Sequence, residues 1–509
     1  MIRLRIKEEH MKRILIWLLV ALMVLPCLLA SCAENEQGGE QQSSGENTEQ
    51  LETSNDHDDL GEVDLGGRDI TVVSRVEAVN QSEVYVEETD SDPINAAVYS
   101  RNLALEERLK CNIEVVQYLP EAGSIAGEAV EAVSNMVIAG GTDYNIVANC
   151  SYTSMTLALN GRMTDLRTTS YIDFDKNYWS QGFNDALSYK NSQFFVTGPM
   201  SLSYYRYMFV TMFNKRIMED EGLGESLYET VENGEWTIDY MTGVAERFYR
   251  DLNGSGSHDA ADLYGFCARI GPTSSMMDGY WEGSEICILR KDEDNAYSYE
   301  IDKERLTNSI DKVLALLGSS GTFTATTNAG DGDVLTKFAQ DEAAMINYRL
   351  IAVEDSIIRN MANDYGILPV PKLTEAQDYK THVQVEVILY GVPSTCYDQI
   401  DDLGKFLEAY ASESYNRVKP AYYEVALTSK YVKDQQSVDM LDRIVNSVAI
   451  DPINLYCVSF NFTSANIRAV HESGTNTVNS LVRKNENAVK KAVKKLNESL
   501  DKVIEQQGE

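Results

Sequence analysis

Short apolar runs alternate with amphipathic stretches from residue 68 onward. Residues 70–73 are apolar and β-branched, a pattern that predicts a buried strand. The stretch 92–109 opens on Asp-Pro, which favours a helix start, and then repeats apolar residues at near-helical spacing. Residues 113–116 and 144–147 predict two further strands, with a helix over 126–139 between them. Strands and helices that alternate in this way predict a parallel α/β sheet.

The residues that follow two of these strands are candidates for ligand binding. Ligands of open α/β sheets bind beyond the carboxyl ends of the strands. Ser74 and Arg75 follow the first strand, and Asn149 and Tyr152 follow the third. We therefore expect these four side chains to contact a ligand. The alternative is that they belong to ordinary loops.

The longest apolar run lies near the start of the chain. It extends from Ile14 to Leu29, follows two basic residues and leads into Leu-Ala-Ser-Cys, which ends at Cys32. A basic start, a short apolar run and small residues before a Cys predict a secretory signal rather than a membrane span, which needs about 20 apolar residues. The segment resembles a bacterial lipobox, which implies that residues 1–31 are a signal peptide and that Cys32 carries a diacylglycerol. The alternatives are an ordinary signal peptide and a buried apolar helix.

Residues 32–65 predict a disordered acidic tether. From residue 33 to residue 65 the chain carries eleven acidic side chains, no Lys or Arg, and almost no apolar residue. Such a segment buries too little surface to offset its chain entropy. We expect a globular body that begins at residue 66 and is tied by this tether to the extracytoplasmic side of the cell membrane.

Length and charge narrow the function of the body. About 440 residues follow the tether, which is too many for one hydrophobic core and predicts two domains. The chain has 79 acidic and 44 basic residues and a net charge of −35. A body this acidic repels nucleic acid and anionic lipid, so the composition argues against a nucleic-acid-binding protein.

Cysteine usage predicts thiols rather than a metal or redox motif. An even number of Cys in a secreted chain permits disulfides. However, most of the six Cys after Cys32 lie in apolar runs, where Cys acts as a small hydrophobic residue, and no Cys-x-x-Cys occurs. We expect mostly buried thiols, with a Cys267–Cys287 bridge as the alternative. The six are Cys111, Cys150, Cys267, Cys287, Cys396 and Cys457.

Several segments, taken in order, resemble a known family. The segments are 160–166 (NGRMTDL), 209–220 (FVTMFNKRIMED), 227–238 (LYETVENGEWTI), 341–347 (DEAAMIN) and 365–371 (YGILPVP). No single one of them is a strong motif, but their order over about 400 residues is specific. On this basis the chain resembles the family 1 extracellular solute-binding proteins of ABC importers.

The resemblance implies an α/β, two-lobe fold of the periplasmic-binding-protein type II, with a hinge of several chain crossings. It places lobe 1 at 66–200 and 345–392, lobe 2 at 201–344 and 393–475, and a C-terminal helix at 476–509. In this family a solute is captured between the lobes, and the closed form docks on a membrane permease. Most members bind sugars or oligosaccharides, which implies a carbohydrate-like solute here.

Six further residues are expected in the cleft between the lobes. Sugar recognition uses aromatic rings against C–H faces and planar polar groups around the hydroxyls. The sequence places such residues near the predicted crossings and in one Gly-flanked loop. They are Tyr205, Trp281, Tyr348, Arg349, Gln384 and Glu386. The alternatives are core packing for Trp281 and a structural salt bridge for Arg349.

One loop has the spacing of a twelve-residue calcium loop. Oxygen-bearing side chains alternate along 251–262, and Gly256 occupies the sixth position, where the turn is sharp. Asp at position 12 and Ser at position 5 weaken the expected affinity. We predict a structural Ca²⁺ site, and the alternative is an acid-rich turn without an ion. The predicted ligands are Asp251, Asn253, Ser255, Ser257, Asp259 and Asp262.

The last segment, 476–506, predicts one long amphipathic helix. Its apolar residues are spaced alternately by four and three, and Lys residues cover the other face. We expect the apolar face to pack on a lobe, with a coiled-coil dimer as the alternative. The apolar positions are Val489, Val493, Leu496, Leu500 and Val503.

Catalysis is the main rival class. No Gly-x-Ser-x-Gly, His-Glu-x-x-His or phosphate-binding Gly-Lys-Thr/Ser motif occurs. A glycosidase needs only two carboxylates, so Glu282, Glu285 or Glu386 could contribute to such a pair. A calcium-stabilised surface scaffold is a third class. We predict instead a monomeric, non-enzymatic, lipid-anchored receptor that passes a carbohydrate to an ABC permease.

Overall fold

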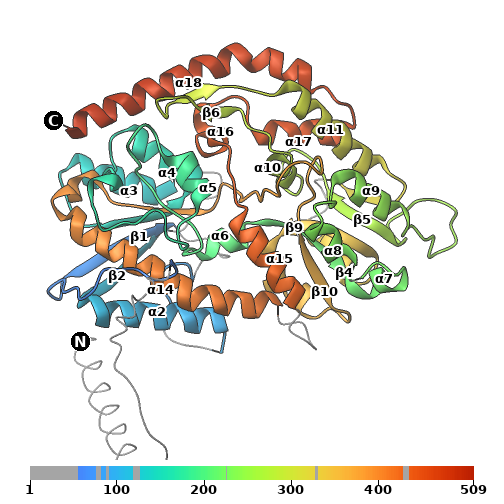
Figure 1. The fold of residues 1–509 in the computed structure, drawn as a ribbon, viewed down its shortest axis with the longest axis horizontal. Coiled ribbons are helices and arrows are strands. Elements are labelled where there is room, and N and C mark those ends of the chain that lie inside the picture. The colour runs from blue at the N-terminus through green and yellow to red at the C-terminus, as the bar shows by residue number, and fades with distance from the viewer. Residues whose placement is uncertain are drawn as a thin grey trace, which may run out of the picture. The chain divides into compact units, whose positions relative to one another are not determined.

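Two sheets with packed helices organise the structure (Figure 1). The computed structural model describes residues 55–75, 82–87, 91–118, 127–224, 226–326, 331–427 and 435–508. No helix in this described part is both long and apolar enough to cross a membrane. The predicted signal peptide, Cys32 and most of the predicted tether lie outside the described residues.

The first sheet has the strand order β11-β3-β1-β2. β1, β2 and β3 run parallel, and β11 runs antiparallel to β3. The strands are β1 (Asp69–Arg75), β2 (Asn112–Tyr118), β3 (Ile146–Cys150) and β11 (Ile388–Gly391). The parallel sheet predicted from the alternating pattern is therefore confirmed, and β11 arrives from late in the chain.

Local sequence explains the first strand and helix of this sheet. In β1 the apolar residues Ile70, Val72 and Val73 are at most 1% exposed, because the sheet is covered on both faces. α2 (Pro93–Leu109) begins after Asp92, whose carboxylate accepts hydrogen bonds from two backbone N–H groups of the first turn. The predicted helix start is thus confirmed.

The second sheet has the order β10-β4-β9-β5-β8. β5 runs parallel to both β8 and β9, whereas β4 runs antiparallel to β9 and β10. The strands are β4 (Phe209–Asn214), β5 (Tyr264–Arg269), β8 (Thr322–Ala325), β9 (Ala343–Arg349) and β10 (Tyr365–Pro369), with a separate hairpin of β6 (Leu289–Lys291) and β7 (Tyr297–Tyr299). Each sheet with its helices forms one lobe.

The helices pack around these sheets and on the outside of the molecule (Figure 1). Further bounds are α3 (Gly127–Ile138), α4 (Ser151–Leu159), α5 (Gln181–Leu187), α6 (Leu202–Arg206), α7 (Lys215–Asp220), α8 (Ser226–Glu232), α9 (Ile238–Glu246), α10 (Gly279–Gly283), α11 (Lys303–Gly318), α12 (Asp331–Ala339), α13 (Ser356–Arg359), α14 (Ile400–Leu427), α15 (Gln435–Asn446), α16 (Pro452–Leu455), α17 (Arg468–Ser473) and α18 (Val478–Gly508). Short 3₁₀ turns include η4 (Leu350–Glu354) and η6 (Cys457–Ser459).

The return crossing lies later than residue 345, where the family resemblance predicts it. The predicted lobe 1 segment 345–392 is wrong for residues 345–369, because β9 and β10 pair with β4 in the second sheet. A single strand cannot be divided at residue 345, because its register with β4 continues to Arg349. The chain returns to the first sheet between β10 and β11. The first crossing, near 197–202, agrees with the placement of α6 before β4.

α14 belongs with the first lobe, not with the second as expected for 393–475. It packs along α2, and its apolar residues Leu403, Phe406 and Leu407 are at most 1% exposed. Arg101 of α2 lies under the ring of Tyr410 at 4.2 Å. The family resemblance did not indicate this placement of α14. The helix follows β11 of the first sheet and folds back on the same lobe.

The body begins earlier than residue 66. Asp58 forms a bidentate salt bridge with Arg108 of α2, with 2.8 Å between Nη1 and Oδ2, and Asp59 pairs with Lys176 at 2.8 Å. Val63 and Leu65 are buried in the core of the first lobe. The prediction of a disordered tether through residue 65 was therefore wrong for 55–65, since its acidic residues find basic partners on the body.

α18 confirms the predicted C-terminal helix but contacts both lobes rather than one. Its buried residues include all five apolar positions predicted from the spacing. Near its start, Asn476 donates to the Thr307 carbonyl of α11 at 3.1 Å. Near its end, Gln507 Nε2 donates to the Met163 carbonyl at 2.6 Å, and Asp501 pairs with Lys190 at 2.5 Å. The helix therefore joins a helix of lobe 2 to loops of lobe 1.

The six Cys that the structure describes are free thiols, and four of them are buried. Cys267, fully buried in β5, and Cys287 are both free thiols, so the alternative of a Cys267–Cys287 bridge is not met. Burial raises the pKa of Cys267 to about 12, which keeps this thiol protonated and unreactive at neutral pH.

Candidate ligand-binding cleft

Four of the predicted ligand residues gather at the carboxyl ends of β1 and β3. Arg75 Nη1 donates to the hydroxyl of Tyr152 at 2.9 Å and to the sulfur of Cys150 at 2.7 Å. Ser74 and Asn149 are each 1% exposed, whereas Arg75 and Tyr152 are half-buried. The topology therefore brings together the residues that sequence reasoning selected, with Arg75 and Tyr152 nearer the surface than the other two.

Tyr152 is a hydrogen-bond donor at physiological pH. Burial raises its pKa to about 12, the nearby thiol and Glu386 add to the rise, and the guanidinium of Arg75 opposes it. Burial raises the pKa of Cys457 to about 11, and the nearby charge of Glu386 adds to the rise.

A cavity of about 490 Å³ lies beside the carboxyl end of β9. Tyr348 and Arg349 end that strand and line the cavity, and Arg349 Nη1 donates to Gln384 Oε1 at 3.1 Å. Gln384 lies on the return crossing between β10 and β11. The lining residues come from α2, α6, β9, η4, α12 and one turn of lobe 1, and are Ser82, Asn95, Arg206, Leu335, Tyr348, Arg349, Ile351, Ala352, Glu354 and Asp355.

An ion pair between a buried Arg206 and a half-buried Glu354 forms one wall of this cavity. Arg206 of α6 donates from Nε and Nη2 to the carboxylate of Glu354, at 2.8 and 3.0 Å. The pair holds the first crossing against η4 in a fixed geometry, and bidentate guanidinium–carboxylate pairs are strong and directional. Since Arg206 is 5% exposed, its partner neutralises a charge that burial would otherwise make costly.

Sequence reasoning missed Ser82 and Asn95, the two residues of lobe 1 that line the cavity, and the ion pair between Arg206 and Glu354. Asn95 lies in the first turn of α2, and helices that follow parallel strands begin at the carboxyl edge, so their first turns are a usable signal. Arg206 lies beside Tyr205 in the predicted crossing, where only the aromatic ring is expected to contact a sugar. No pattern in the sequence pairs Arg206 with Glu354, which is 148 residues away.

Two of the expected cleft aromatics lie in the core instead. Tyr205 has no exposed surface, stacks on Tyr422 with 5.2 Å between ring centroids, and donates its hydroxyl to the Pro199 carbonyl at 2.7 Å. Trp281 is 5% exposed, and its Nε1 lies 3.4 Å from Asp451. The structure therefore does not bring either ring into the cavity at β9, and core packing is the role that it shows for both.

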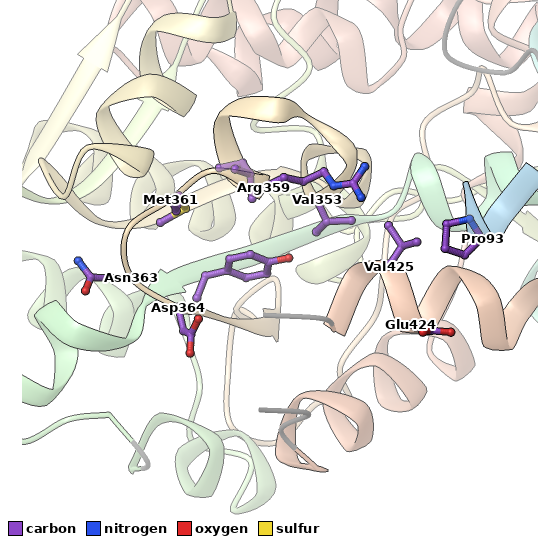
Figure 2. Close-up of a pocket in the computed structure, with 10 residues that line it drawn as sticks. Pro93, Val353, Arg359, Met361, Asn363, Asp364, Glu424 and Val425 are labelled. Carbon is purple, nitrogen blue, oxygen red and sulfur yellow. The ribbon is translucent and has the colours of Figure 1, made fainter. Parts of the chain in front are cut away.

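A second cavity, of about 390 Å³, lies near the end of α14 (Figure 2). Figure 2 shows Pro93, Val425 and Glu424 on one side of it, with Asn363 and Asp364 on the other. Its lining combines apolar and charged groups, including Arg359. The two cavities involve different residues of α2 and of the segment after β9.

Side chains of the calcium-like loop accept hydrogen bonds from the backbone of the same loop. The carboxylate of Asp251 accepts hydrogen bonds from the backbone N–H groups of Gly254 and Gly256, at 2.7 and 2.8 Å. Asp262, fully buried, accepts one from Leu252 at 3.2 Å. Within the described residues, no group of three or more His, Cys, Asp or Glu is arranged to hold a metal ion. Calcium binding therefore stays a prediction.

Two of the candidate catalytic carboxylates face protein groups. Glu282 is 3% exposed, and its carboxylate lies 2.5 Å from His382 Nδ1. Glu285 accepts from Arg305 at 2.8 Å. Neither lines the cavity at β9, so these two residues do not form the open pair, on either side of a bound sugar, that a glycosidase requires.

The similarity of this chain to known proteins is found in their structures and not in their sequences. No known family model matches the sequence, and no curated protein matches it either. The GacH receptor of Streptomyces glaucescens GLA.O, solved unliganded and with acarbose, aligns with a TM-score of 0.50 at 14% identity, over 84% of this chain and 99% of that chain.

Two other solved structures align equally well. A cyclo/maltodextrin-binding protein complexed with maltotetraose gives a TM-score of 0.51 at 12% identity, over 86% of this chain and 97% of that one. A family 1 extracellular solute-binding protein from Bifidobacterium longum subsp. infantis gives 0.50 at 12% identity, over 87% and 100%. The chain has the two-lobe α/β fold of family 1 extracellular solute-binding proteins, as the ordered segments of the sequence predicted.

Proposed function

We propose that this protein is the solute receptor of an ABC importer and that it binds a carbohydrate, specifically an oligosaccharide, between its lobes. In this proposal Cys32 carries a lipid that holds the monomeric protein on the extracytoplasmic side of the membrane. The receptor presents its solute to a membrane permease and carries out no chemical reaction itself.

The cavity at β9 is the observation that carries the proposal. Its volume of about 490 Å³ lies within the range of small-molecule sites, about 300–1,000 Å³. Tyr348 offers an aromatic ring, Arg349 a guanidinium, and Asn95 and Ser82 an amide and a hydroxyl. These are the groups that bind the apolar face and the hydroxyls of a sugar.

The position of the cavity fits a receptor that closes on its solute. Asn95 comes from lobe 1, Arg349 from lobe 2, and Arg206 from the first crossing. A solute that contacts all three favours the closed arrangement over an open one by its additional contacts. The proteins of similar fold named above include one solved with acarbose and one solved with maltotetraose, which supports the choice of oligosaccharides.

A thermal-shift screen tests this function. The chain from residue 32 onward, with Cys32→Ser to avoid acylation, is screened against mono- and oligosaccharides, amino acids and peptides. A ligand at about 100 times its Kd stabilises the native state by about 2.7 kcal/mol. A sugar that raises the melting temperature and is recovered unchanged after incubation supports a receptor. Turnover of that sugar would support the enzyme class instead. If no sugar raises the melting temperature, the result contradicts a carbohydrate as the solute.

We also propose that the loop 251–262 binds one structural Ca²⁺ ion. Five side chains with oxygen atoms and the carbonyl of Ser257 lie in one tight loop, and hard oxygen ligands suit this cation. Asp251, Asp259 and Asp262 would supply the carboxylates. The role is structural, because the loop precedes β5 and contributes no residue to the cavity at β9.

A further inference from the structure

One face of α18 has a charge opposite to that of the chain as a whole. Between residues 483 and 495 the helix carries six basic residues and one acidic residue, although acidic residues outnumber basic ones 79 to 44 in the whole chain. Seven basic residues of α18 are exposed, and together they are here named the basic face: Arg483, Lys484, Lys490, Lys491, Lys494, Lys495 and Lys502.

The basic face is extended and open. Residues 483–502 of a helix extend over about 29 Å at 1.5 Å per residue. Figure 1 shows α18 on the outside of both sheets. Three acidic residues lie within residues 483–502. Glu486 pairs with Lys490 at 3.0 Å, Glu498 lies 3.6 Å from Lys494, and Asp501 pairs with Lys190 at 2.5 Å, but exposed pairs of this kind are weak. They neutralise part of the positive charge and leave a net positive row.

The opposite face of α18 is fully used for packing. Val489, Leu496 and Leu500 are at most 3% exposed, and the helix is fixed to lobe 2 through Asn476 and to lobe 1 through Gln507. The helix therefore has no apolar face left to insert into a bilayer. Any partner of the basic face must bind through charge and must present a negative surface about as long as the row of basic side chains.

We propose that the basic face of α18 docks this receptor on the anionic headgroups of the membrane to which it is tethered. The proposal rests on the membrane anchoring included in the proposed function. A planar layer of acidic headgroups matches a long, straight row of basic side chains better than a compact pocket does. The acidic composition of the body repels anionic lipid as a whole, but salt screens charges that lie more than about 8–10 Å from the headgroups. At contact, the basic face therefore outweighs the repulsion from the more distant acidic surface.

The test uses vesicles with and without acidic lipid. The chain from residue 32, carrying Cys32→Ser so that no acyl chain contributes, is sedimented with phosphatidylcholine vesicles or with equal parts of phosphatidylglycerol and phosphatidylcholine. The variant replaces Lys484, Lys491, Lys494 and Lys495 with Gln, which preserves helix propensity. The matched control removes four exposed basic charges elsewhere, through Lys110→Gln, Arg216→Gln, Arg247→Gln and Arg417→Gln.

The proposal predicts binding to the acidic vesicles only, weakened at least about tenfold in the α18 variant, unchanged within about twofold in the control, and abolished by about 1 M salt. No binding at low salt, or equal losses in both variants, would overturn it. Binding to membranes that contain the permease but not to pure lipid would assign the basic face to a protein partner and also overturn it. Sugar-induced stabilisation of the α18 variant is measured in parallel, so a failure of docking is distinguished from a failure of solute binding.

Discussion

Glu408 makes the stability of lobe 1 depend on pH. It lies on α14, is 2% exposed, and accepts hydrogen bonds from the hydroxyl of Tyr178 at 2.5 Å and from Trp179 Nε1 at 3.1 Å. Burial raises its pKa from the ordinary 4.5 to about 7, although both hydrogen bonds oppose the rise. The folded protein therefore favours the protonated carboxyl, whereas the unfolded chain ionises it readily.

The sign and size of the effect follow from this pKa. A raised pKa contributes stability that is fully present below the unfolded value of 4.5 and is lost as pH rises through about 7. The difference between the two pKa values corresponds to about 3 kcal/mol. Glu408→Gln resembles the neutral carboxyl in shape and hydrogen bonding at every pH. The free energy of unfolding of the wild type, relative to this variant, should therefore fall by up to about 3 kcal/mol between about pH 5 and about pH 8.

Urea unfolding at several pH values measures this difference. Subtracting the variant from the wild type cancels the groups common to both, including Asp451, whose pKa burial also raises to about 7. The variant should equal or exceed the wild type in stability at the higher pH. Parallel stability curves for the two proteins would refute the reasoning, because they would mean that Glu408 titrates alike in the folded and unfolded chains.

Three further predictions concern other parts of the body. Asp58→Ala should lower the free energy of unfolding in urea by about 1–3 kcal/mol, because it leaves Arg108 without its bidentate partner. An unchanged free energy of unfolding would mean that residues 55–65 belong to the disordered tether and not to the body. Leu500→Ala, at a fully buried position of α18, should cost about 2–5 kcal/mol, and exposed Lys502→Ala less than about 0.5; equal urea midpoints for the two variants would contradict the packing of this helix. Calcium should raise the melting temperature of the wild type but not of Asp259→Asn, and equal shifts in both would refute the calcium loop.

The sequence predicted those elements whose signal is local. The β-branched run at 70–73, the Asp-Pro helix start at 92–93 and the regular spacing of apolar residues in α18 each became the expected strand or helix. Their patterns reflect burial of one face or of a whole strand, which depends little on distant partners. The sequence also predicted that the residues after β1 and β3 lie close together, because a parallel sheet places the carboxyl ends of its strands at one edge.

The remaining features depend on distant partners. β9 could be assigned to its sheet only from its pairing with β4, about 130 residues earlier, and Asp58 is ordered by a basic residue on α2. Trp281 between two glycines looked accessible, but Asp451 from much later in the chain covers its ring nitrogen. Aromatic residues near a crossing serve equally well as core or as ligand platform, and only the packing around them decides between the two.

A calorimetric titration of the sugar found in the screen tests the central claim most directly. The wild type is compared with Arg349→Gln, which shortens a cavity side chain, and with Arg216→Gln on exposed α7 as the matched control. Hydrogen bonds from a charged group contribute about 1.5–3 kcal/mol, so Arg349→Gln should weaken binding about tenfold or more while the control keeps the wild-type Kd. Equal affinities for all three proteins would contradict a solute site at the carboxyl end of β9.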